Sequence, residues 1–464
     1  MIIIPDDIVF HVLQFLDLKF LVLVASRVSH QFYEQSLKIP FGLNLKGKVL
    51  PEELILKIFP SEPNNIRDDD HRYYNITSLD LNHCMLRAEH FKQISASPRS
   101  RNLRNLDATL NTLLEEGAKA IGESQYFRNS LLETLKLGFC SIGNEGLKYL
   151  MHSNFRNLTS LDLTKNDLDN EALEMIATSP YMNKLKFLTL KRNLFDGNGV
   201  EKLVYGANLH NLTFLDLSMN EIYDTAFLKA IASSDNMKNL QILKLQHMHI
   251  NTSTGLQYLA DSSNLQNFTE LDLAFNSLQI LSLNSNSKIF MNLRTLILDF
   301  NQLGKDSMVT ITNFCNLTKL SVDSNYFRDD AIEYLASSPN MKHLTWLKLA
   351  NNSLGYESVK HIFNSKYLGN MEHLDLTNNS DLTDEISQLL QPSTILSLQH
   401  LKTLVLAELC LTGSDISEEA VSALSQSKTL HNIRMVNLKF TLVSRETIQQ
   451  VESSCGILFV VDKR

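Results

Sequence analysis

The residues of this chain that could bind a metal or act on a substrate are few and far apart. His247 and His249 form an H-x-H pair, but no third ligand stands at a spacing that a zinc site requires. The sequence contains no glycine-rich phosphate loop, no G-x-S-x-G and no H-E-x-x-H. We therefore interpret the histidine pair as incidental, and we expect no enzymatic activity, no cofactor and no bound metal.

The cysteines indicate a reducing compartment rather than a disulfide framework. Five cysteines are scattered along the chain, and an odd number cannot all pair. They are Cys84, Cys140, Cys315, Cys410 and Cys455. No run of 18 apolar residues occurs, and the first residues lack the basic start of a secretory signal. We expect a cytoplasmic or nuclear protein without a membrane partner.

The composition supports a large core and argues against nucleic acid as a partner. Apolar residues make up 44% of the 464 residues, and charged residues make up 20%. The formal net charge is −8, and no basic run interrupts the sequence. Because neutralising phosphates needs clustered lysine and arginine, nucleic-acid binding is not expected.

One pattern, L-x-x-L-x-L-x-x-N-x-L, fills most of the chain after about residue 75. It is clear in LTSLDLTKNDL (158–168) and in LTFLDLSMNEI (212–222). Its fourth position recurs 14 times, at a mean spacing of about 27.5 residues. These positions are Leu79, Leu106, Leu135, Leu161, Leu188, Leu215, Leu243, Leu271, Leu296, Leu320, Leu347, Leu374, Leu404 and Val436. The pattern predicts a stack of structural repeats.

The ninth position predicts a buried column of side chains. The L-x-L segment reads as a short strand whose leucines point inward, and the chain turns away after it. An asparagine amide both donates and accepts, so it can satisfy the backbone groups that this turn leaves inside. Asparagine stands there at 111, 166, 193, 220, 276, 301, 325, 352 and 379. Cys84 and Cys140 replace it twice, and we expect an interrupted column at Met248, Leu409 and Thr441.

Segments such as NEALEMIATSP and DDAIEYLASSPN carry apolar residues at helical spacing and predict one helix per repeat. With periods of 26–29 residues, the chain resembles the ribonuclease-inhibitor-like subclass of leucine-rich repeats. This resemblance implies an α/β solenoid, a curved horseshoe with a parallel sheet on its concave side and helices on its convex side. The repeats near 271–320 shorten and 280–290 lacks a clear helical pattern, which predicts a local change of curvature.

The ends of the array are predicted to differ from its middle. LNLKGKVLPEELILKIFPSE (43–62) keeps the strand and helix pattern, so we interpret it as a capping repeat; a second copy of the N-terminal motif is the alternative. We predict a helical module at 1–38, a capping repeat and loop at 39–74, leucine-rich repeats at 75–445 and a C-terminal cap at 446–464.

The stretch PDDIVFHVLQFLDL (5–18) is unlike everything after it. It predicts a short helix that leaves almost no polar face, followed by a second apolar helix. Two helices in about 30 residues cannot bury this surface on themselves. The surface must therefore contact either the solenoid, as a cap, or a separate protein.

Residues 4–34, IPDDIVFHVLQFLDLKFLVLVASRVSHQFYE, resemble the F-box, a small all-α module. Phe20 stands where an acid is common in that family, and Phe32 replaces its usual tryptophan. The resemblance implies that the module docks on a Skp-family adaptor of a cullin-type ubiquitin ligase while the repeats hold a target protein. The implied adaptor contacts are Pro5, Ile8, Val12, Leu13, Leu16 and Leu21. The alternatives are a repeat scaffold or inhibitor without a ligase, and a GTPase activator of the same repeat class.

Target binding is expected on the sheet, at the third, fifth and seventh positions of each repeat. Exposed aromatic side chains and a lone tryptophan are common anchors of protein interfaces. We predict contacts by Phe187, Phe214, Ile242, Lys244 and Trp346, with plain strand-to-strand packing as the alternative for the first three. Aspartate at the fifth position belongs to the repeat consensus, so its presence does not indicate a binding role.

Overall fold

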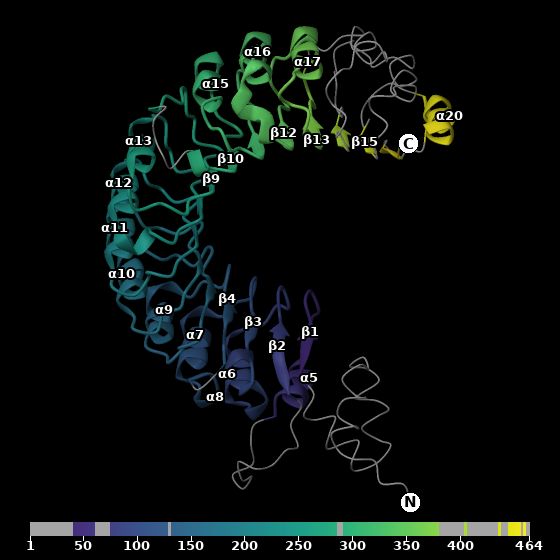
Figure 1. Ribbon diagram of the computed structural model, residues 1–464. Coiled ribbons are helices and arrows are strands. Elements are labelled where there is room, and N and C mark those ends of the chain that lie inside the picture. The colour runs from purple at the N-terminus through teal and green to yellow at the C-terminus, as the bar shows by residue number, and fades with distance from the viewer. Residues whose placement is uncertain are drawn as a thin grey trace, which may run out of the picture. The chain divides into compact units, whose positions relative to one another are not determined.

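The computed structural model describes residues 40–60, 75–128, 131–284, 291–379, 403–405, 435–437, 444–455 and 458–460. The chain divides into two compact units. Unit 1 comprises Met1–Asn220 and Asp235–Met237, and unit 2 comprises Glu221–Ser234 and Lys238–Arg464. In each unit, short parallel strands form a sheet that helices cover on one side (Figure 1). The predicted leucine-rich-repeat solenoid is confirmed.

The described strands of unit 1 are mostly three residues long. They are β1 Phe41–Asn44, β2 Ile76–Asp80, β3 Asn105–Asp107, β4 Thr134–Lys136, β5 Ser160–Asp162, β6 Phe187–Thr189 and β7 Phe214–Asp216. The described helices behind them are α5 Glu52–Ile58, α6 Ala88–Ala96, α7 Leu114–Glu123, α8 Gln125–Arg128, α9 Gly143–Met151, α10 Asn170–Thr178 and α11 Gly197–Tyr205, with 3-10 turns η2 Pro98–Ser100 and η3 Asp235–Met237.

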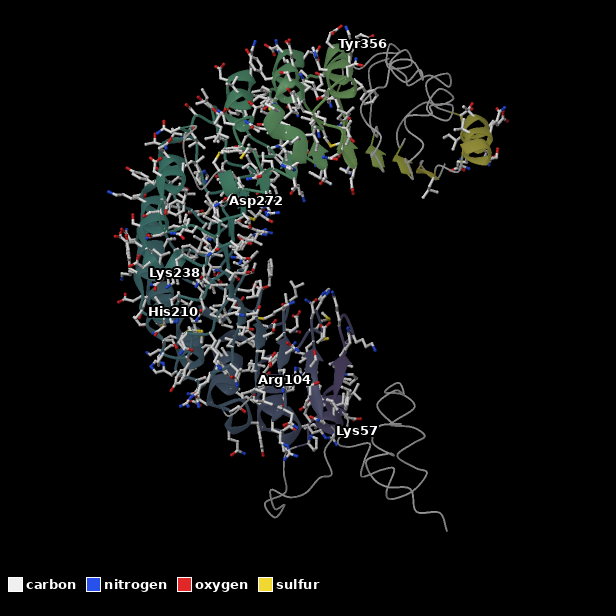
Figure 2. All side chains as sticks on the ribbon, viewed as in Figure 1. Lys57, Arg104, His210, Lys238, Asp272 and Tyr356 are labelled. Atoms are coloured by element: carbon white, nitrogen blue, oxygen red, sulfur yellow. The ribbon has the colours of Figure 1, made fainter. Side chains whose placement is uncertain are left out.

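Unit 2 repeats the same order of elements. Its described strands are β8 Ile242–Lys244, β9 Glu270–Asp272, β10 Thr295–Ile297, β11 Lys319–Ser321, β12 Trp346–Lys348, β13 His373–Asp375, β14 Thr403–Val405, β15 Met435–Asn437 and β16 Leu458–Val460. Its described helices are α12 Ala226–Ser233, α13 Thr254–Asp261, α15 Lys305–Ile311, α16 Asp329–Ser337, α17 Tyr356–Phe363 and α20 Arg445–Cys455, with the 3-10 turn η4 Pro339–His343. In Figure 2, Asp272 lies on the sheet side of this unit and Tyr356 on its helix side.

The repeat frame sets the register of both sheets. All 14 predicted frame positions lie in strands, and neighbouring frame residues stand directly opposite one another. Leu79 pairs with Leu106 in unit 1, and Leu271 pairs with Leu296 in unit 2. These four leucines are at most 1% exposed. Burying one leucine contributes roughly 1.5–3 kcal/mol, so the stacked leucines provide a continuous core.

The predicted asparagine column is present in both units. Asn193 accepts hydrogen bonds from the backbone N–H of Asn166 (2.9 Å) and Leu168 (3.1 Å), and it donates to the carbonyl oxygens of Leu163 (3.0 Å) and Leu190 (2.9 Å). All nine predicted asparagines are buried. Each amide therefore ties its own turn to the repeat before it.

Two cysteines and one methionine take the place of asparagine as predicted. The Cys84 thiol donates to the Leu45 carbonyl (2.9 Å), and the Cys140 thiol donates to the Ala108 carbonyl (3.2 Å). Burial raises the pKa of Cys140 to about 12, so this thiol is unreactive. Met248 is buried at the same place and provides no amide, which interrupts the column. Leu409 and Thr441 lie outside the described residues.

The eighth position of the repeat has a left-handed backbone, which the sequence did not indicate. Twelve described repeats share it, with φ between 48° and 60°. The residues are His83, Leu110, Phe139, Lys165, Arg192, Met219, His247, Phe275, Phe300, Ser324, Asn351 and Asn378. Such values of φ are costly for side chains other than glycine and asparagine, yet the buried ninth position forces the turn.

A second set of hydrogen bonds joins the helix side of successive repeats. A buried serine that follows one helix donates to a carbonyl oxygen at the end of the preceding helix. Ser124 donates to Ser95, Ser153 donates to Gly122 (2.7 Å), and Ser179 donates to Met151 (2.8 Å). These serines satisfy carbonyl groups that helix ends leave without partners.

At the N-terminal end of the described chain, β1 pairs in parallel with β2 and places Leu43 opposite Leu79. The α5 helix follows within the same segment, as expected for a repeat. The predicted domain boundaries themselves remain predictions. Among the described helices, none is long and apolar enough to cross a bilayer.

Candidate functional site

The sheet of each unit has one face turned away from its helices, here called the sheet face. It carries the third, fifth and seventh positions of each repeat, as predicted. Several of these side chains are nevertheless buried by their neighbours, including Asp216, Asp272, Ser321 and Asp323. Fewer side chains of each sheet face are therefore accessible than the third, fifth and seventh positions of the repeat predicted.

A groove of about 550 Å³ crosses the sheet face of unit 1. Small polar side chains at the third position form its floor, and Phe187 closes it. The floor residues are Ser78, Asn105, Thr134 and Ser160. Because small residues follow one another on four strands, the backbone lies close to the surface there. This groove offers room for a segment of another protein.

The groove carries two carboxylates and one amine. The Lys136 Nζ atom lies 3.7 Å from Asp107 Oδ2, on the neighbouring strand. Asp80 and Asp107 each use Oδ1 to accept the backbone N–H two residues further on, at 3.1 Å in both cases. Aspartate at the fifth position thus fixes the turn of its own repeat, which explains its frequency.

Two predicted target contacts meet beside this groove. The rings of Phe187 and Phe214 lie 6.1 Å apart at an angle of 38°. Phe187 is 47% exposed, whereas Phe214 is half-buried. Ile242 and Lys244 belong to β8 of unit 2 and are half-buried. The structure brings Phe187 and Phe214 together as predicted, and it leaves the binding role of all four untested.

Trp346 lies on the sheet face of unit 2 between two neighbours of the same frame position. Its ring stacks on His373 at 4.9 Å with an angle of 6°, and Lys319 Nζ lies 4.5 Å from the ring centre. Burial lowers the pKa of His373 and favours the neutral ring. A tryptophan held in this way presents its edge rather than its faces to a partner.

An ion pair lies next to Trp346 on the same face. Lys348 Nζ pairs with Asp323 Oδ2, and Asn351 also donates to the Asp323 carboxylate (2.8 Å). Burial opposes the charge on Lys348, but the hydrogen bond and charge of Asp323 raise the pKa of this lysine overall. The raised pKa favours the charged form of Lys348.

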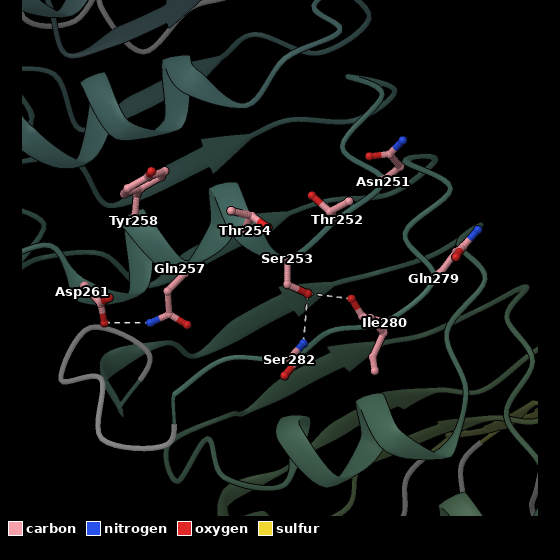
Figure 3. Close-up of a pocket in the computed structure, with 10 residues that line it drawn as sticks. All are labelled: Asn251, Thr252, Ser253, Thr254, Gln257, Tyr258, Asp261, Gln279, Ile280 and Ser282. Atoms are coloured by element: carbon pink, nitrogen blue, oxygen red, sulfur yellow. Dashed lines mark hydrogen bonds between the residues drawn. The ribbon is translucent and has the colours of Figure 1, made fainter.

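A second hollow, of about 620 Å³, lies on the helix side of unit 2 beside α13 (Figure 3). Ser253 Oγ donates to the Ile280 carbonyl (2.6 Å) and accepts from Ser282 N–H (3.0 Å), which fixes the loop that follows β9. Gln257 donates to Asp261 across its floor (2.7 Å). These polar groups satisfy one another, so the hollow shows no group prepared for a ligand.

The histidine pair is not part of a metal centre in the described region. No group of three or more His, Cys, Asp or Glu side chains there is arranged to hold a metal ion. His247 and His249 instead contact each other edge to face at 5.6 Å, and Tyr223 stacks on His249 at 4.7 Å.

Family models match two parts of the chain. An F-box domain model matches residues 2–44, and a leucine-rich repeat model matches residues 128–151, 156–177 and 208–226. This chain combines an F-box domain with leucine-rich repeats. The F-box match ends at Asn44, the last residue of β1, so it includes the first described strand of unit 1.

Known proteins resemble parts of the repeat array. NACHT, LRR and PYD domains-containing protein 14 of Mus musculus is 32% identical over 160 residues, which are 33% of this chain and 16% of that protein. Protein 12 of the same name in Homo sapiens is 30% identical over 162 residues, or 33% of this chain and 15% of that protein. The chain thus matches about one sixth of the length of these relatives.

Solved structures with a similar fold include an internalin from Listeria monocytogenes and a chain of the yeast Rad7 and Elc1 complex. The internalin is 20% identical with a TM-score of 0.47, over 78% of this chain and 94% of that chain. The yeast chain is 16% identical with a TM-score of 0.45, over 78% of this chain and 81% of that chain.

The residues predicted to contact the adaptor fall inside the F-box match, and all of them lie outside the described residues. They are Pro5, Ile8, Val12, Leu13, Leu16 and Leu21. Their contacts remain a prediction of the sequence.

Proposed function

We propose that this chain is the substrate-recruiting receptor of a cullin-type ubiquitin ligase. In this proposal the F-box domain docks on a Skp-family adaptor, and the sheet faces of the repeats bind the target protein. The observation that carries the proposal is the F-box match at 2–44 in the same chain as leucine-rich repeats. We expect the complex in the cytoplasm or nucleus.

A receptor of this kind needs no catalytic residue of its own. It holds a target lysine near a ubiquitin carrier, and the gain comes from effective concentration. The groove of unit 1 and the Trp346 surface of unit 2 support the proposal, because they provide hollow and aromatic surfaces for a protein target.

Co-expression with a Skp-family adaptor tests the proposal. We expect the wild-type chain to co-purify with the adaptor and Leu13→Asp or Leu16→Asp to lose it, because each variant places a charge in the apolar segment that the sequence predicts to dock. Leu194→Asp is the matched control, since Leu194 is 62% exposed on unit 1 and lies outside the F-box match.

Two results would contradict the proposal. One is a wild-type chain that does not co-purify with the adaptor. The other is co-purification that survives both F-box variants, which would favour a repeat scaffold whose N-terminal helices serve as a cap.

A further inference from the structure

Five residues of unit 2, in the segments that follow β7, β8, β9 and β10, form a row of aromatic side chains, here called the aromatic rim. It consists of Tyr223, His247, His249, Phe275 and Phe300. Tyr223 stacks on His249, and His249 contacts His247. Phe275 and Phe300 stack at 4.2 Å with an angle of 8°. The turns are joined by backbone hydrogen bonds from His247 to Ala274 (3.0 Å) and from Phe275 to Asp299 (2.8 Å).

The fold gains little from these aromatic residues where they stand. Phe275 and Phe300 are 45% and 46% exposed, and Tyr223 is 72% exposed. Both phenylalanines also have left-handed backbones, with φ of 59° and 54°. The left-handed backbone is common to the eighth position of every described repeat, so it is the exposure of these stacked rings that favours a partner.

A carboxylate that forms no ion pair within the described residues comes directly before one residue of the rim. Asp299 precedes Phe300, and its Oδ1 atom accepts the backbone N–H of Asp323 (2.9 Å). Within the described residues Asp299 forms no ion pair, whereas Asp323 is paired with Lys348. Two carboxylates thus lie near one lysine, which pairs with only one of them.

A buried hydroxyl marks the same place. Ser321 is 2% exposed, and its hydroxyl completes no hydrogen bond of good geometry with the described residues. It lies close enough to the Asp299 carboxylate to favour its charged form. The Ser321 hydroxyl therefore supports the Asp299 carboxylate from below, and the carboxylate is the polar group that this site offers to a partner.

We propose that the aromatic rim and Asp299 together bind an extended protein segment that presents a lysine or arginine beside an apolar side chain. The carboxylate accepts hydrogen bonds from the cation, and the rings of Phe275 and Phe300 cover its alkyl stem and the neighbouring apolar group. The inference rests on the proposed receptor function for its meaning, since it names the chemistry of the target.

The test selects random 12-residue peptides displayed on phage against the immobilised full-length chain. Selected peptides are synthesised and their dissociation constants measured by fluorescence anisotropy. We expect them to share a lysine or arginine next to an apolar residue. Phe300→Ser and Asp299→Asn should each weaken binding about tenfold, because each removes one of the two contacts.

Two controls separate binding from folding. Tyr334→Ser removes an aromatic residue that is 43% exposed on α16 and should leave the affinity unchanged. Replacing the basic residue of the peptide with norleucine should weaken binding to the wild type but add little to the loss in Asp299→Asn, because both changes remove the same contact.

Peptides without a basic residue, an affinity that Phe300→Ser leaves unchanged, or no selected peptide at all would each overturn the inference. None of these results depends on the adaptor. A chain that selects such peptides but fails to co-purify with a Skp-family adaptor would retain this binding surface and lose only the ligase function.

Discussion

At the scale of single residues, aspartate has two distinct uses on the sheet faces. At the fifth position its oxygen accepts the N–H of the seventh residue, as in Asp162 and Thr164 (2.9 Å). That contact is local and recurs from repeat to repeat. Asp299 is at the seventh position instead, and it accepts from the next repeat. Aspartate at the fifth position therefore fixes the turn of its own repeat, whereas Asp299 joins two neighbouring repeats.

The half-buried charge of Asp299 has a cost that depends on pH. Burial raises the pKa of Asp299 above that of an ordinary carboxyl group, and the nearby Asp323 charge adds to the effect. The folded protein therefore holds this proton more tightly than the unfolded chain does. The resulting stabilisation is complete below the unfolded pKa and is lost as the pH rises through the folded pKa.

We predict that Asp299→Asn is more stable than the wild type at neutral pH and that this advantage disappears in acid. The amide can still accept the Asp323 N–H, but it carries no charge to desolvate. Urea unfolding midpoints measured between about pH 3 and pH 7 test this, because they span the titration of carboxyl groups. Asp306→Asn, at an exposed position of α15, is the control.

A gain in stability together with a loss of peptide binding would identify Asp299 as a residue retained for function. A variant that is less stable than the wild type at neutral pH would contradict the prediction.

At the scale of elements, the helices approach one another closely where glycine allows it. Gly122 lies in α7, and a Cβ atom there would stand 2.6 Å from the carbonyl oxygen of Tyr149 in α9. The Gly122 carbonyl also accepts the Ser153 hydroxyl (2.7 Å). Helix spacing and the serine hydrogen bond therefore depend on the same residue.

We predict that Gly122→Ala lowers the free energy of unfolding by about 1–3 kcal/mol, because the added methyl group forces α7 and α9 apart. Chemical denaturation of the full chain measures this loss. Gly304→Ala is the matched control, since the nearest atom to its Cβ would be 3.9 Å away. Equal effects of the two substitutions would show that the close approach does not matter.

The consensus residues of the repeat predicted which side chains each repeat buries. They predicted much less about the side chains that it exposes. The leucines at fixed positions predicted the strands and their pairing register, and the asparagines predicted the buried column. Each of these residue types has a single physical role at its position. The hydrogen bonds from the buried serine hydroxyls were not predictable from the sequence. Donor and acceptor are about 30 residues apart, and serine is common in loops. The left-handed eighth position is occupied by histidine, leucine, phenylalanine and lysine in different repeats, so no residue type identifies it in the sequence.

The candidate site was only partly predictable for the same reason. Phe187, Phe214 and Trp346 stand out as aromatic residues on strands, and the structure places them on the sheet faces. Asp299 and Ser321 look like ordinary strand-end residues. Their importance comes from which neighbours the register places beside them, and a single sequence does not contain that information.

At the scale of the whole molecule, the proposed function assigns separate tasks to the F-box domain and the repeats. Repeat arrays derive their stability from contacts between neighbouring repeats, so removal of a module that docks elsewhere should leave them intact. This separation distinguishes a receptor from a scaffold with an N-terminal cap.

We predict that deleting residues 1–38 abolishes adaptor binding but shifts the thermal midpoint of the repeats by less than about 2 °C, which corresponds to a loss of no more than about 1 kcal/mol. Differential scanning calorimetry and co-purification give the two readouts. A midpoint lowered by many degrees would instead favour the cap.

The in-register pairing of strands also limits how a bound segment can slide. Successive repeats offer equivalent side chains at intervals of about 4.8 Å, whereas an extended segment lying across them presents alternate side chains every 6.7 Å or so. Because the two intervals differ, a side chain of the segment and a repeat of the sheet come into the same relative position again only after about seven repeats. A target that fits one pair of repeats is therefore out of step with the next, and a surface built from near-identical units can still fix the position of its partner.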